Sequence, residues 1–108
     1  MPAHNAPAIK LITDRYSEHV RMFNHTPGLT QADSDAHFDL LQELTALATA
    51  ALTRAPQVKP TGNRVALLPA TDLGNVRIAM RRAFTDAERA RYDEIQEELH
   101  ALTDKYED

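Results

Sequence analysis

Apolar side chains recur at steps of three and four residues in four separate stretches of the chain. This spacing places them on one face of an α-helix, whereas a half-buried strand would alternate apolar and polar residues. Turn-forming and helix-breaking residues separate the stretches. The sequence therefore predicts an all-α fold, a small bundle of three or four helices. The expected helices cover residues 6–24, residues 35–54, a third stretch from Thr71 or Asp72 to the residues before Thr85, and residues 86–105.

Short-range capping signals mark the ends of these helices. Thr85-Asp-Ala-Glu88 has the spacing of a capping box and predicts the start of the last helix. Asn5 is expected to cap the first helix, and either Thr30 or Ser34 the second. The second helix has the widest apolar stripe, so we expect it to be the central helix, in contact on two sides. Its apolar positions are Phe38, Leu40, Leu41, Leu44, Leu47, Ala48, Ala51 and Leu52.

The length of 108 residues predicts a single domain over residues 1–108, with residues 1–5 and 107–108 frayed. The chain has no cysteine, which excludes disulfides, thiolate zinc sites and cysteine nucleophiles. No apolar run approaches the ~20 residues of a membrane span. The N-terminal residues have neither the basic start nor the apolar block of a signal peptide. We therefore expect a cytoplasmic protein.

Residues 55–70 interrupt the helical pattern between the second and third predicted helices. The apolar run Arg64–Leu68 follows a turn-forming segment, and it predicts either an extended arm or one strand of a short β-hairpin with Gln57–Lys59. Long connections in compact domains tend to be functional. We therefore expect the apolar side chains of this segment to contact a partner, although they could equally cover the chain's own core. They are Val65, Leu67 and Leu68.

The last predicted helix carries a narrow apolar seam at steps of three and four residues. Its members are Tyr92, Ile95, Leu99, Leu102 and Tyr106. The seam is typical of a coiled coil but spans only about two heptads. It predicts either a dimer contact through Ile95 and Leu99, or packing of the helix on its own domain.

Charge is distributed unevenly along the chain. Residues 54–91 carry eight basic and three acidic side chains, whereas residues 92–108 carry one basic and seven acidic ones. The basic side chains include a cluster that could meet nucleic-acid phosphates, formed by Arg64, Arg77, Arg81 and Arg82. Alternatively, the basic helix packs beside the acidic last helix, within one chain or across a dimer. The last helix supplies Asp93, Glu94, Glu97 and Glu98 for that role. The net charge of −4 weakens long-range attraction to nucleic acid.

The sequence contains no convincing catalytic or metal-binding motif. Asp33, Asp35 and His37 have a spacing that could gather a metal ion, but acidic residues are expected near a helix start in any case. No Ser-His-Asp order and no glycine-rich phosphate loop is present. We therefore predict neither an enzyme nor a bound metal or cofactor. The expected function is that of a small helical interaction protein, a homodimer that also contacts another protein. The alternative is a nucleic-acid-associated regulator that uses basic residues within 54–91.

Overall fold

The computed structural model describes residues 4–58 and 72–107, which form four helices. They are α1 (Ala6–Phe23), α2 (Gln31–Arg54), α3 (Leu73–Ala83) and α4 (Asp86–Asp104). The prediction of a small all-α bundle is confirmed. No strand occurs in these two ranges, and the predicted arm or hairpin strand at 64–68 lies outside them. Over the same ranges, no helix combines the length and the apolar character that crossing a bilayer requires.

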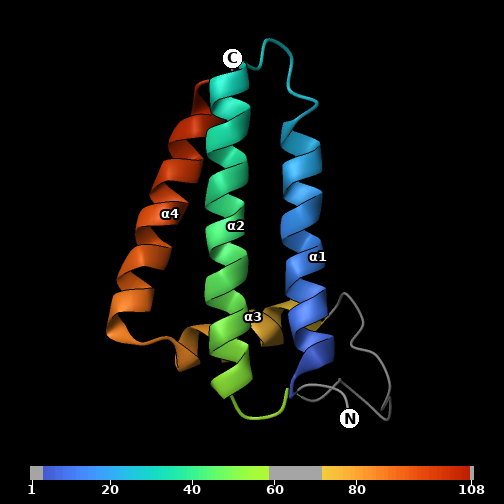
Figure 1. Cartoon of the computed structure of the whole chain (residues 1–108), viewed down its shortest axis with the longest axis vertical. Helices are drawn as coiled ribbons and strands as arrows, with labels where there is room; N and C mark the ends of the chain where they lie inside the picture. The colour runs from blue at the N-terminus through green and yellow to red at the C-terminus, as the bar shows by residue number, and fades with distance from the viewer. Residues whose placement is uncertain (1–3, 59–71, 108) are drawn as a thin grey trace.

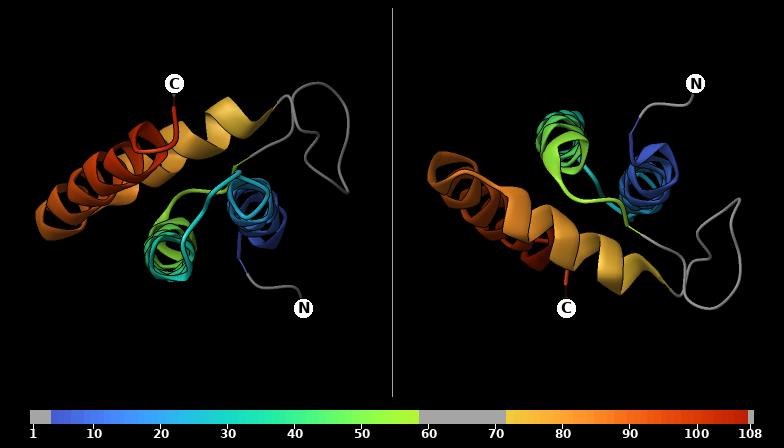
Figure 2. Two further views of the ribbon diagram at one scale, coloured as in Figure 1. Left: turned by 90° about the horizontal axis from the view of Figure 1, so that it is seen from above. Right: turned by 90° about the horizontal axis from the view of Figure 1, so that it is seen from below.

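The bundle consists of two layers. Helices α1 and α2 lie side by side and antiparallel, and α4 runs along α2 (Figure 1). Helix α3 crosses one end of this pair, and α3 and α4 both lie on the same side of it (Figure 2). Helix α2 contacts each of the other three helices, which confirms its predicted central place.

All four helices contribute to one core. Its largest fully buried apolar side chains are Ile12, Leu44, Leu52, Val76, Met80 and Ile95. These residues belong to the apolar faces that the three- and four-residue spacing predicts. Because α3 buries only Val76 and Met80, its opposite face remains open to solvent.

The two predicted threonine caps are present. Thr85 Oγ1 accepts a hydrogen bond from the Glu88 amide at 3.1 Å, and the Glu88 carboxylate accepts one from the Thr85 amide at 2.9 Å. This reciprocal pair is the expected capping box at the start of α4. At the start of α2, Thr30 Oγ1 accepts from the Asp33 amide at 3.1 Å. Helix α2 therefore begins at Gln31, earlier than the predicted residue 35.

Asn5 does not cap its own helix. It adopts the left-handed conformation, with φ of 59°, and its side chain reaches the far end of α2. The Asn5 Nδ2 group donates to the carbonyls of Leu52 (2.8 Å), Ala55 (3.3 Å) and Pro56 (3.2 Å). Asn5 Oδ1 accepts from the Val58 amide at 2.8 Å. The residue is only 1% exposed, so at this position the structure also differs from the expected frayed end.

The opposite end of the bundle is closed by contacts between α4 and the start of α2. Lys105 Nζ lies 2.9 Å from Asp33 Oδ2, and the Tyr106 hydroxyl donates to the same carboxylate at 2.5 Å. The Tyr106 ring packs edge-on against Phe23, with ring centroids 5.9 Å apart. The hydrogen bonds from Lys105 and Tyr106 lower the pKa of Asp33. These contacts hold the residues that directly follow α4 against the start of α2.

Candidate functional site

Contacts between α2, α3 and α4 hold α3 in place. They thereby position its outer face, the solvent-exposed side opposite its buried residues. Helix α3 ends at Ala83, whose carbonyl accepts a hydrogen bond from Arg54 at 3.0 Å. A cation is favourable at this end of a helix. The Arg54 guanidinium also pairs with Glu88. The hydrogen bond from Arg54 is the largest cause of the lowered pKa of the Glu88 carboxyl group. Arg54 and Glu88 therefore hold the end of α3 against the start of α4.

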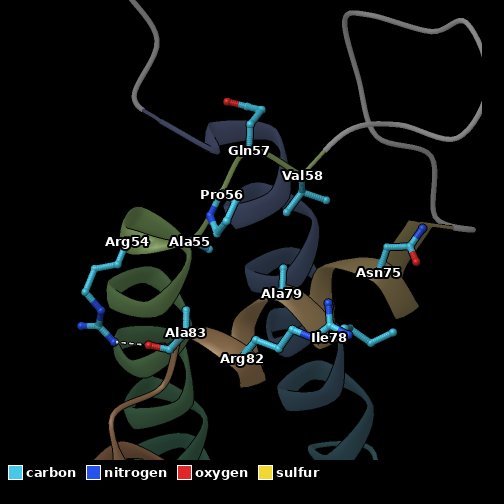
Figure 3. A pocket seen from close by; sticks show the side chains of 10 residues that line it. All are labelled: Arg54, Ala55, Pro56, Gln57, Val58, Asn75, Ile78, Ala79, Arg82 and Ala83. Carbon is cyan, nitrogen blue, oxygen red and sulfur yellow. Dashed lines mark hydrogen bonds between the residues drawn. The ribbon is translucent and has the colours of Figure 1, made fainter.

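A cavity of about 580 Å³ runs along α3 and the segment that follows α2 (Figure 3). Six of the ten lining residues are apolar, and two of the four polar ones are arginines. The lining residues are Arg54, Ala55, Pro56, Gln57, Val58, Asn75, Ile78, Ala79, Arg82 and Ala83. Ile78 is 51% exposed, which is unusual for a large aliphatic side chain. Ile78 is not among the residues that the sequence predicts for a contact site. Its position two residues after the buried Val76, off the apolar face, was the signal that could have identified it.

Three of the four predicted phosphate-contacting arginines lie on α3. Arg77, Arg81 and Arg82 are all exposed. Within residues 4–58 and 72–107, no carboxylate lies at ion-pair distance from any of them. The predicted pairing of these arginines with the acidic residues of α4 therefore does not occur inside the described part of one chain. Arg64 lies outside the described residues.

The carboxylates of α4 that do form ion pairs use a different arginine. Arg91 Nη1 lies 3.1 Å from Glu94 and 3.2 Å from Glu98, and the same guanidinium binds Glu43 on α2. The hydrogen bond from Arg91 lowers the pKa of Glu43. This network joins the first half of α4 to α2 through a single arginine. It includes two of the four acidic residues that were predicted to pair with the basic helix.

The other two acidic residues form an open row. Asp93 and Glu97 are one helical turn apart on α4, both are exposed, and neither has an ion-pair partner in the ranges that the structure describes. Arg77 and Arg81 form a row of the same spacing on α3. Like charges one turn apart repel each other. A partner of opposite charge would therefore stabilise each row.

An aromatic contact holds the second arginine of the basic row. The Arg81 guanidinium lies 5.7 Å from the centre of the Tyr92 ring, a cation–π arrangement. Tyr92 in turn packs against Phe84, with ring centroids 5.3 Å apart. Arg81 is therefore directed over the junction of α3 and α4, although no carboxylate of the described chain neutralises it.

The apolar residues that were predicted to contact a partner either pack on the chain's own core or lie outside the described residues. Ile95 is fully buried among the core residues, and Leu99 is half-buried and packs against the same core. The seam of α4 thus packs on its own domain, as the sequence also allowed, and Ile95 is not accessible to a second copy in this structure. Val65, Leu67 and Leu68 lie outside the described residues.

Asp33 and His37, whose spacing in the sequence could have gathered a metal ion, make other contacts. The Asp33 carboxylate is held by Lys105 and Tyr106, while the His37 ring stacks on Phe23 with centroids 4.0 Å apart. Over residues 4–58 and 72–107, no three His, Cys, Asp or Glu side chains gather in a way that could hold a metal ion.

Comparison of the chain with protein-family models, with curated proteins and with solved structures gives no match.

Proposed function

We propose that the chain is a non-catalytic assembly protein that acts by protein contact, and that its first partner is a second copy of itself. In this dimer, the outer face of α3 in each copy lies against the outer face of α4 in the other. The observation that carries the proposal is the pair of open charge rows, Arg77 with Arg81 and Asp93 with Glu97.

The two rows match in both sign and spacing. Each consists of two residues separated by one helical turn, so an α3 helix lying along an α4 helix brings both arginines to both carboxylates. A two-fold axis generates this contact twice, because the same surface serves on both copies. The self-complementary charge favours a second copy over an unrelated protein.

The energetics indicate a weak, reversible dimer. An exposed ion pair contributes about 0–1 kcal/mol, and salt screens it. Burial of a half-exposed aliphatic side chain such as Ile78 adds about 1 kcal/mol per copy. Association must also overcome the loss of translational and rotational freedom. Because these gains exceed the cost only slightly, we expect a dimer that is populated at high protein concentration and dissociates on dilution.

Sedimentation velocity over a range of concentrations tests this proposal. The wild-type chain should shift from monomer towards dimer as concentration rises, and less so when salt is raised from about 0.05 to about 0.5 M. Arg77→Gln with Arg81→Gln should remain monomeric. The matched control, Lys10→Gln with Arg21→Gln, removes the same charge from α1 and should dimerise like the wild type. A chain that stays monomeric at about 1 mM and low salt would refute the proposal.

A second candidate function is nucleic-acid binding, which the same unneutralised arginines favour. Lys and Arg side chains that replace counterions on phosphates supply most of the affinity in such complexes. The acidic outer face of α4 opposes it. Gel retardation of duplex and single-stranded DNA at about 50 mM salt, where such binding is strong, decides the question. Retardation that is lost with Arg77→Gln, Arg81→Gln and Arg82→Gln would support it, and its absence in the wild type would exclude it.

A further inference from the structure

The cavity along α3 is a groove with two walls. One wall is the side of α3 that carries Asn75, Ala79 and Ala83, and the other consists of the residues that follow α2 (Figure 3). The helix rises about 1.5 Å per residue, so the stretch from Asn75 to Ala83 is about 12 Å long. An extended polypeptide advances about 3.3 Å per residue, so the groove has the length of about four extended residues.

The groove offers apolar side chains and amide groups from both walls. Pro56 and Val58 lie on one wall and Ala79 on the other. These apolar groups can contact the side chains of a bound segment. Gln57 and Asn75 add one side-chain amide from each wall. A side-chain amide both donates and accepts hydrogen bonds, as the peptide groups of a bound chain do.

One positive charge of the groove is not neutralised. Arg54 is turned towards the Ala83 carbonyl and pairs with Glu88 (Figure 3). Arg82 extends along α3 instead, and no carboxylate of the described residues lies at ion-pair distance from it. Residues 59–71 contain no acidic side chain that could supply one. A guanidinium binds a carboxylate through two parallel hydrogen bonds. The groove is therefore complementary to a segment with one negative charge.

We propose that the groove binds a short extended segment of a partner polypeptide, in which one acidic residue stands between two apolar ones. Successive side chains of an extended segment point to opposite sides. The two apolar side chains therefore face Val58 and Ala79, while the acidic one faces outwards, where the exposed Arg82 pairs with it. Arg77 and Arg81, which carry the proposed dimer contact, are not in the lining, so this binding does not depend on dimerisation.

Titration of the isotope-labelled chain with the peptide acetyl-Ala-Leu-Glu-Leu-Ala-amide, followed by NMR, tests the proposal. The amide signals of Val58, Asn75 and Ile78 should shift and saturate. This peptide should bind about fivefold more tightly than the same peptide with Gln in place of Glu. It should bind more than tenfold more tightly than the peptide with Ala in place of both Leu residues. Equal affinity for the three peptides, or shifts that do not saturate, would overturn the proposal. Equally tight binding of hexanoate would assign the groove to a small acid and overturn the assignment to a polypeptide.

Variants of the unneutralised arginine distinguish this contact from general attraction of an acidic peptide. Arg82→Gln should weaken binding of the Glu peptide about fivefold and leave binding of the Gln peptide unchanged. Arg82→Glu should prefer a peptide with Lys at the central position. Arg82 is exposed, so both variants should keep the wild-type thermal midpoint. Arg21→Gln removes the same charge from α1 and is the matched control, which should bind like the wild type.

The double variant Arg77→Gln with Arg81→Gln separates peptide binding from dimerisation. It should be monomeric and still prefer the Glu peptide to the Gln peptide. A preference for the Glu peptide that persists unchanged in Arg82→Gln would refute the assignment, whether or not the wild type dimerises.

Discussion

Replacement of Asn5 should be among the most destabilising single changes in the described chain. Its side chain makes four hydrogen bonds to the end of α2 and the residues after it. Two amide hydrogens serve three carbonyls, so the four contacts amount to about three full hydrogen bonds, or about 3 kcal/mol. Asn5 also has a φ of 59°, which costs an alanine about 1 kcal/mol more than a glycine. We expect Asn5→Ala to lose about 4 kcal/mol of unfolding free energy and Asn5→Gly about 3 kcal/mol.

Urea unfolding followed by circular dichroism measures both values. The slope of the transition should stay the same in the two variants, because the surface exposed on unfolding does not change. Asn24→Ala is the matched control: its side chain is exposed and accepts one hydrogen bond, from Ser34 at 2.8 Å. It should lose no more than about 1 kcal/mol. A loss of less than about 1 kcal/mol in Asn5→Ala, or equal stability of the alanine and glycine variants, would refute the role assigned to Asn5.

Two further predictions concern acid stability and the apolar residues. The thermal midpoint should fall in two stages as the pH is lowered. The first stage begins below about 6.5, because His19 and His37 have lowered pKa values and bind protons more readily in the unfolded chain. The second begins below about 4.5, where the lowered pKa of Glu88 ceases to favour the folded state. A midpoint that stays constant from pH 7 to pH 4 would contradict both assignments. Ile95→Ser should cost about 3–4 kcal/mol in urea unfolding and Ile78→Ser less than about 0.5 kcal/mol, and similar losses would contradict the burial assigned to them.

The predictable features of this fold are those that depend on neighbours in sequence. The Thr85–Glu88 capping box involves residues three apart, and its spacing alone predicts the start of α4. Likewise, the wide apolar stripe of α2 predicts its central place, because only a helix in contact on several sides needs so much apolar surface. Such signals do not depend on how the helices are later arranged.

The features that could not be predicted depend on residues far apart in sequence. Asn5 resembles an ordinary N-cap residue, and its true partners, such as Leu52, come near only after α1 and α2 have paired. The same holds for Arg91 on α4, whose partner Glu43 on α2 is 48 residues away in sequence. The cavity along α3 is lined from two separate stretches, within residues 54–58 and 75–83, and no single stretch of sequence encodes it.

The central claim is that the open charge rows of α3 and α4 meet across a dimer, and exchange of the charges tests it most directly. One variant carries Arg77→Glu and Arg81→Glu, so that both of its faces are acidic. The other carries Asp93→Arg and Glu97→Arg, so that both are basic. Each variant alone should be monomeric in sedimentation velocity, because like charges then oppose each other in both contacts. An equimolar mixture should form a heterodimer at least as tight as the wild-type dimer, and a mixture that remains monomeric while the wild type dimerises would contradict the account.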